Sequence, residues 1–218
     1  MRRLGLLLAL ACLLAGCGGS GGGSQTTTQA QAQSQKGGCT PVEAPAATRR
    51  TATKPTEPID ATKRYDVVMK TNCGSFTIRL DPKQSPHTVA SFVSLVRKKF
   101  FDGTIFHRIA PGFVIQGGDP TQTGAGGPGY TTVDRPPASA RYTHGVVAMA
   151  KTSVQPPGTA GSQFFVVTAK DAGLTPDYAI IGKVMKGLDV VDRIGKLGDQ
   201  NEQPTRVVEI EHATVSVS

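Results

Sequence analysis

From Tyr65 onward, short apolar segments alternate with Gly- and Pro-rich connections, and this pattern constrains the fold more than any other feature. Residues 65–70 and 75–80 alternate apolar and polar side chains on either side of a turn at 71–74, which predicts a β-hairpin. Further short strands are expected at 113–116, 145–150, 163–168, 179–184 and 207–217. Many short strands with few helices predict a mainly β domain, with its sheet closed into a barrel or packed as a sandwich.

Two segments have the periodicity of amphipathic helices. Ser85-Pro86 predicts the start of the first, with serine as the cap and proline at the first helical position. Its expected buried side chains are Val89, Phe92, Val93 and Val96. The second is expected at 188–197, with Leu188, Val191 and Ile194 on one face.

The N-terminal residues have the pattern of an export signal. Arg2 and Arg3 precede an apolar run at 4–15, whose helical length of about 18 Å is too short for a bilayer core of about 30 Å. Leu14-Ala15-Gly16-Cys17 resembles a bacterial lipobox. We therefore predict a signal peptide at 1–16 and a lipid on Cys17, and the alternative is an ordinary signal peptide with an incidental cysteine.

Residues 17–64 are rich in Gly and Ser, then in Gln, Thr and Ala, and then in Pro. Such a segment has little apolar surface to bury, so we predict a disordered tether ahead of a folded domain at 65–218. The tether and the domain each retain one cysteine, Cys39 and Cys73. In an oxidising compartment this even pair predicts a disulfide between the end of the tether and the first hairpin. Two free thiols are the alternative.

Charge and motif spacing exclude several classes of function. Eight basic and three acidic residues at 1–64 account for +5 of the net charge of +8, so the domain itself is nearly neutral and we expect no nucleic-acid partner. The histidines, His87, His107, His144 and His212, lack metal-site spacing, so we expect no metal and no cofactor. The glycine-rich run 124–129 contains Pro128 and precedes no helix, which excludes a phosphate-binding turn.

Three motifs in order carry a family resemblance. The first motif resembles the signature of the cyclophilin peptidyl-prolyl isomerases, and it reads Phe106-His107-Arg108-Ile109-Ala110-Pro111-Gly112-Phe113-Val114-Ile115-Gln116-Gly117-Gly118-Asp119. The second motif is Gly161-Ser162-Gln163-Phe164-Phe165, which residues 145–150 precede, and the third motif spans residues 174–184. The resemblance covers residues 65–218 and implies an eight-stranded antiparallel β-barrel closed by two α-helices.

The same resemblance implies the site residues. Arg108 would hydrogen-bond the prolyl nitrogen as the amide loses conjugation, with Phe113 and Gln116 beside it as catalytic residues. Gln163 would position Arg108 and the peptide, and the backbone of Ala150 and Lys151 would meet the extended substrate. The predicted walls of the proline pocket are Phe113, Val114, Phe165, Leu174, Tyr178 and Ile181. His107 is expected to be structural rather than catalytic.

Several positions depart from the family pattern. Gly173 stands where many members have a tryptophan, Tyr178 where histidine is common, and Ile181 where an aromatic side chain is usual. Val114 replaces a methionine and Lys151 an asparagine. Because the residues proposed for catalysis are intact, the resemblance still implies isomerase activity, with weak sensitivity to cyclosporin.

Together these features predict a monomeric, lipid-anchored isomerase in a bacterial cell envelope. Its substrates would be exported polypeptides whose folding waits on X-Pro bonds. The rival function is a binding or chaperone module that holds proline-containing segments in the same groove, with incidental turnover.

Overall fold

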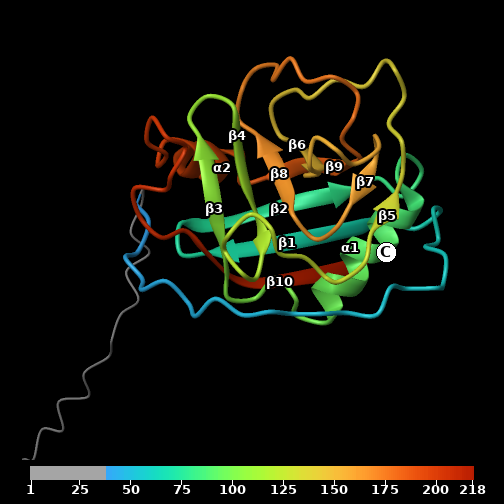
Figure 1. Ribbon diagram of the computed structural model, residues 1–218, viewed down its shortest axis with the longest axis horizontal. Coiled ribbons are helices and arrows are strands. Elements are labelled where there is room, and N and C mark those ends of the chain that lie inside the picture. The colour runs from blue at the N-terminus through green and yellow to red at the C-terminus, as the bar shows by residue number, and fades with distance from the viewer. Residues whose placement is uncertain (1–37) are drawn as a thin grey trace, which may run out of the picture. The chain divides into compact units, whose positions relative to one another are not determined.

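A computed structural model describes residues 38–218, which form one compact unit. Eight antiparallel strands close into a barrel in the order β1-β10-β3-β4-β8-β6-β9-β2 (Figure 1). Their bounds are Tyr65–Thr71 (β1), Gly74–Leu80 (β2), Thr104–Ala110 (β3), Val114–Asp119 (β4), Val146–Met149 (β6), Phe164–Val167 (β8), Ile180–Lys186 (β9) and Glu209–Val217 (β10). The outer segments Thr132–Val133 (β5) and Thr159–Ala160 (β7) pair with each other. The predicted barrel is confirmed.

The two helices are α1, Pro86–Arg97, and α2, Leu188–Gly195. Ser85 occupies the N-cap position of α1, but its hydroxyl donates to the carbonyl of Ile180 at 2.7 Å and does not cap the helix. The carboxylate of Asp134 takes that role and accepts from the Thr88 N–H at 2.6 Å. The predicted side-chain cap is therefore wrong, because a distant loop supplies the acceptor that the local sequence suggested.

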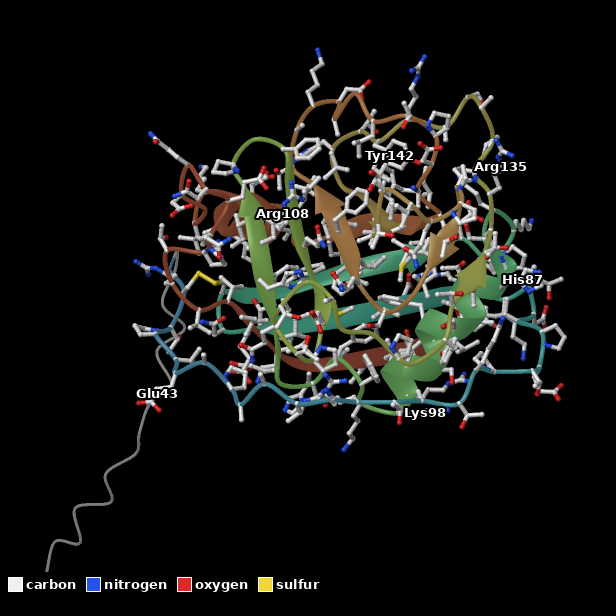
Figure 2. The ribbon with its side chains drawn as sticks, in the orientation of Figure 1. Glu43, His87, Lys98, Arg108, Arg135 and Tyr142 are labelled. Carbon is white, nitrogen blue, oxygen red and sulfur yellow. A yellow bond between two sulfur atoms is a disulfide. The ribbon has the colours of Figure 1, made fainter. Side chains whose placement is uncertain are left out.

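Strand β3 was not expected from the pattern of apolar residues. Its pairing with β4 shifts register between Ile105 and Phe106 and again between Phe106 and Arg108, so both His107 and Arg108 are half-buried. These bulges break the period-two alternation by which a strand is recognised. Figure 2 labels Arg108 at the upper end of β3.

Residues 38–64 differ most from the prediction. They were expected to be a disordered tether, but they form an extended strap that crosses the domain. The amides of Thr48 and Ala52 donate to the carbonyls of Pro120 and Pro128, both at 2.9 Å. The guanidinium of Arg50 donates to the carbonyls of Phe100 and Asp102 at 2.6 and 2.7 Å. Backbone and guanidinium hydrogen bonds hold the strap, and its apolar side chains Cys39, Ala52 and Ile59 pack against the larger core cluster. Residues 1–37 lie outside the described part of the chain.

The strap is fastened to the barrel at its N-terminal end. Cys39 and Cys73 form a disulfide, which is the predicted pairing. Beside it, the amide of Thr40 donates to the Asn72 carbonyl at 2.8 Å, and the Asn72 side-chain amide donates back to the Thr40 carbonyl at 2.8 Å. The first β-hairpin thus receives the strap through one covalent bond and two hydrogen bonds. Figure 1 shows the strap in blue.

Two clusters of buried apolar side chains organise the domain. The larger fills the barrel and includes Phe92 of α1, whose ring centroid lies 4.9 Å from that of Phe101 and 5.7 Å from that of Phe164. The smaller lies outside the barrel around Val114, Tyr142 and Phe165. This second cluster forms the base of the candidate site. Within residues 38–218, no helix is long and apolar enough to cross a membrane.

Candidate active site

A chain of polar side chains begins at Arg108. Its Nε donates to Oε2 of Glu202 at 2.5 Å, and its Nη1 donates to Oε1 of Gln116 at 3.2 Å. The Cζ atom lies 5.9 Å from the centroid of the Phe113 ring, within range of a cation–π interaction. The guanidinium is thereby fixed on two edges and lies beside an aromatic face. The sequence predicted the association of Arg108 with Gln116 and Phe113 but did not indicate Glu202.

The chain continues through Gln163 into the glycine-rich loop. The Gln116 amide donates to Oε1 of Gln163 at 3.1 Å. Nε2 of Gln163 in turn donates to the carbonyls of Gly124 and Gly126, both at 2.9 Å. The loop that resembled a phosphate-binding turn therefore supplies acceptors that orient a glutamine, and its carbonyls point toward the polar chain.

Asp119 at the end of β4 shapes that loop. Its carboxylate accepts from the amides of Thr121, Gly124 and Gly126 at 2.8, 2.7 and 3.1 Å. Burial alone would raise the pKa of this carboxyl, but the hydrogen bonds from Gly126, Thr121 and Gly124 hold the pKa below its ordinary value. Asp119 is therefore ionised at neutral pH and keeps the loop in the shape that Gln163 contacts.

A cluster of apolar side chains lies next to the polar chain. Phe113 is half-buried, and Val114 and Phe165 are nearly fully buried. Leu174 and Tyr178 pack against the same cluster, and the Tyr178 ring meets Phe165 edge-on with centroids 5.5 Å apart. The structure thus brings together five of the residues predicted to form the proline pocket.

Ile181 does not belong to this group. It is fully buried inside the barrel with the larger cluster, so its predicted place in the pocket wall is wrong. Neighbouring Ile180 packs with the pocket cluster. Successive side chains of a strand point to opposite faces, so a strand that offers Ile180 to the pocket directs Ile181 into the barrel.

Tyr142 is a structural element of the pocket that sequence reasoning missed. It is fully buried, its hydroxyl donates to the Tyr178 carbonyl at 2.7 Å, and it accepts from the Tyr178 amide at 3.0 Å. Burial raises the pKa of the Tyr142 hydroxyl to about 12, so it remains a donor at neutral pH. Figure 2 shows Tyr142 and Arg108 in the upper half of the view, with Lys98 at the lower edge. A lone tyrosine in a loop carries no sequence signal for such a bridge.

His107 points into the protein. Both ring nitrogens are buried without a hydrogen-bond partner among the described residues, and burial lowers the pKa of the imidazole. A ring whose two nitrogens are buried and whose pKa is lowered is not placed to exchange protons with a substrate. The expectation of a structural role is consistent with this geometry.

A wider cleft extends from the polar chain. It has a volume of about 710 Å³ and is lined by Gln116, Gln163, Ala150, Lys151, the glycine-rich loop and residues 49–51 of the strap. The Ala150 amide donates to the Gln163 carbonyl at 2.9 Å, and the Lys151 ammonium lies 5.5 Å from the Tyr178 ring centroid. The cleft can accept an extended peptide, and the neighbouring apolar cluster offers a surface that a ring-sized side chain can contact.

The family profile described as cyclophilin type peptidyl-prolyl cis-trans isomerase/CLD matches residues 66–215. This chain belongs to the cyclophilin family.

Similar proteins named as isomerases support the same assignment. Peptidyl-prolyl cis-trans isomerase CYP18-2 of Arabidopsis thaliana is 36% identical over 150 residues, which cover 66% of this chain and 90% of the relative. Peptidyl-prolyl cis-trans isomerase A of Mycobacterium tuberculosis is 38% identical over 167 residues, covering 68% and 90% of the two chains. The crystal structure of a cyclophilin type isomerase from Cryptosporidium parvum has a TM-score of 0.65 and 30% identity, and it covers 70% of this chain and 98% of its own.

The family gives this cyclophilin its activity, which is peptidyl-prolyl cis-trans isomerisation. The Cryptosporidium parvum protein was also crystallised in the presence of the dipeptide Ala-Pro, and that structure has a TM-score of 0.63 with 31% identity. The site described above therefore lies in a fold whose members act on X-Pro bonds.

Proposed function

We propose that this cyclophilin is a lipid-anchored folding catalyst outside the cytoplasm, with Arg108 as the residue that accelerates X-Pro rotation in exported proteins. The observation that carries the proposal is the polar chain from Glu202 through Arg108 and Gln116 to Gln163, which lies beside an apolar cluster. The apolar side chains suit contact with a proline ring, and the guanidinium suits the amide nitrogen next to it.

The chemistry requires neither a nucleophile nor a proton donor in exchange with water. Rotation about the prolyl amide has a barrier of about 18–20 kcal/mol, which is set by conjugation between nitrogen and carbonyl. In the twisted state the nitrogen regains its lone pair and can accept a hydrogen bond, whereas in the planar ground state it cannot. A donor from Arg108 thus binds the transition state better than the substrate, and this lowers the barrier.

The surrounding residues complete this role. Phe113, Val114 and Phe165 would hold the proline ring, with Leu174 and Tyr178 as the outer wall. Gln116 and Gln163 would keep Arg108 oriented, and the cleft at Ala150 and Lys151 would bind the remainder of the peptide. Rotation then takes place around a ring that is held still while the rest of the chain turns.

The disulfide between Cys39 and Cys73 supports a location outside the cytoplasm. Disulfides persist in oxidising compartments and are rare in the reducing cytosol. The lipobox-like residues 14–17 suggest the mode of attachment, because a diacylated or triacylated Cys17 would anchor the chain to a membrane. Exported polypeptides that fold near that membrane would be the substrates.

A pair of substitutions tests the attachment. Cys17→Ser should abolish labelling of the chain by radioactive palmitate and shift the protein from the membrane fraction to the soluble fraction. Cys39→Ser is the matched control, since it removes a cysteine without changing the lipobox, and it should leave labelling intact. Equal labelling of the Cys17→Ser variant and the unaltered protein would contradict lipid attachment.

A second experiment separates the enzyme from the rival binding module. A cell that depends on this cyclophilin for maturation of an exported protein should lose that maturation when Arg108→Ala replaces the natural chain. A binding module would instead retain its effect, because the apolar cluster and the cleft remain. Full maturation with an Arg108→Ala protein that is inactive in vitro would favour the binding module.

A further inference from the structure

The loop between α2 and β10 carries Glu202, whose contact with Arg108 no sequence motif indicated. Oε2 of Glu202 accepts from Nε of Arg108 at 2.5 Å. The Glu202 side chain is 43% exposed and the Arg108 side chain is 32% exposed. Glu202 and Phe113 also line one open surface depression of about 620 Å³, which is distinct from the 710 Å³ cleft. The carboxylate therefore lies on the side of the site where Phe113 and Arg108 meet.

The loop holds this glutamate in place with its own hydrogen bonds. Oδ1 of Asp199 accepts from the amides of Asn201 and Gln203, both at 2.8 Å. The Glu202 carbonyl accepts from the Ile109 amide of β3 at 2.9 Å, directly beside Arg108. The backbone of Glu202 is thus tied to the strand that carries the guanidinium, so the two side chains approach from a fixed relative position.

Glu202 has a φ angle of +62°, in the left-handed region that disfavours side chains other than glycine. A glycine would fit the turn with less strain, so the turn itself does not require a glutamate. A half-exposed ion pair also adds little to stability. Neither backbone geometry nor stability accounts for a carboxylate here, whereas its hydrogen bond to Arg108 does.

The two acceptors leave a defined part of the guanidinium available. A guanidinium has five N–H donors on three nitrogens. Glu202 takes Nε and Gln116 takes one donor of Nη1, and no residue of the described range 38–218 accepts from Nη2. The planar group is therefore fixed at two points in its plane, with Nη2 left for a substrate.

We propose that Glu202 is a positioning residue for catalysis: its carboxylate fixes the plane of the Arg108 guanidinium so that Nη2 points at the prolyl nitrogen of the twisted amide. This inference rests on the proposed role of Arg108. Misplacing a reacting group by about 1 Å can lower the rate about 100-fold, so the effect belongs to the rotation step and not to peptide binding.

The test compares Glu202→Gln and Glu202→Gly with the unaltered protein, and it includes both changes in an Arg108→Ala background. Each protein is assayed for kcat and KM on a short X-Pro peptide, and its Tm is measured. Glu211→Gln is the matched control, since it breaks another partly exposed ion pair, with Lys70 at 3.0 Å, on the barrel wall. That control should keep the activity of the unaltered protein.

Glu202→Gly should lower kcat on the order of tenfold with little change in KM, while Tm stays level or rises. Glu202→Gln retains an acceptor oxygen, so it should recover part of that loss. In the Arg108→Ala background neither change should alter kcat by more than about twofold, because the group that Glu202 positions is gone.

Three results would overturn the inference. They are an unchanged kcat in Glu202→Gly, a loss of activity that follows a fall in Tm, and an equal loss with and without Arg108. A separate result bears on the mechanism beneath it. If Arg108→Ala alone keeps full activity, the proposed role of Arg108 fails; if Arg108→Ala is inactive and Glu202→Gly is fully active, only the role of Glu202 fails.

Discussion

Replacing Cys39 with serine removes the covalent link between the strap and the first β-hairpin. The disulfide closes a loop with a sequence separation of 34 residues. In the chain-entropy model, cross-linking a loop of this length removes about 12–13 cal/mol/K from the unfolded chain, or about 3.8 kcal/mol at 25 °C. A freely disordered tether would make this link less relevant to the barrel. Because the strap is hydrogen-bonded along the domain, we expect the disulfide to contribute most of this loop-entropy effect to the free energy of unfolding.

This loop-entropy contribution predicts measurable changes in the free energy of unfolding and in Tm. Monitored by circular dichroism in urea under non-reducing conditions, Cys39→Ser should lower the free energy of unfolding by about 3–4 kcal/mol. For a domain of this size the corresponding fall in Tm is on the order of 10 °C. Cys39 is chosen over Cys73, whose side chain is 2% exposed, since replacing a buried side chain would add a packing defect.

Two controls separate the disulfide from other effects. Reduction of the unaltered protein with dithiothreitol should reproduce the shift, and dithiothreitol should leave Cys39→Ser unchanged. Activity on a short peptide should stay near that of the unaltered protein at 25 °C, because neither sulfur contacts the polar chain. A loss of stability below about 1 kcal/mol would contradict this prediction, since it would mean that the disulfide does not restrict the unfolded chain in this way.

Three further perturbations have defined outcomes. Arg50→Ala should release the middle of the strap and cost about 2–4 kcal/mol, because two hydrogen bonds from a charged group are lost; hydrogen exchange of the Ala52 amide measures the release. Tyr142→Phe should lower the free energy of unfolding by about 1–3 kcal/mol and raise KM, since the Tyr178 amide loses its acceptor inside the protein. Acid should loosen the glycine-rich loop. The pKa of Asp119 is lower in the folded protein than in the unfolded chain, so its stabilisation is complete above about pH 4 and is lost as the pH falls through the folded value. Asp119→Asn should remove that acid-sensitive part of the unfolding free energy, as measured by urea titrations between pH 2 and 6.

The sequence pattern predicted most of the strands because they carry clear local signals, and the family resemblance implied their closure into a barrel. The hairpin around residues 71–74 is an example: alternation places Val67, Met69 and Ile78 inside the barrel, and each is fully buried. Strand β3 lacked that signal. Its two register shifts leave the consecutive residues His107 and Arg108 both at intermediate exposure, so the strand does not alternate between buried and exposed side chains.

The candidate site was predictable to the extent that its residues are adjacent in sequence motifs. Arg108, Gln116 and Phe165 come from such motifs, and the structure brings them together. Glu202 and Tyr142 come from irregular loops, and only the three-dimensional arrangement shows their partners.

The strap was mispredicted for a different physical reason. Composition measures how much apolar surface a segment can bury, but residues 38–64 are held by backbone hydrogen bonds, by Arg50 and by a disulfide. A composition of Pro, Thr and Ala is compatible both with a disordered tether and with a strap that is held on the domain. Only the partners on the domain, such as the Pro120 and Pro128 carbonyls, decide between them.

The most direct test of the account is the rate of cis-trans exchange of a short X-Pro peptide, measured by exchange NMR with the unaltered protein and with Arg108→Ala. Because one preorganised donor to the twisted amide is removed, kcat should fall on the order of 100-fold, with an unchanged fold by circular dichroism. A folded Arg108→Ala protein that keeps the kcat of the unaltered chain would contradict the central claim that this guanidinium carries the reaction.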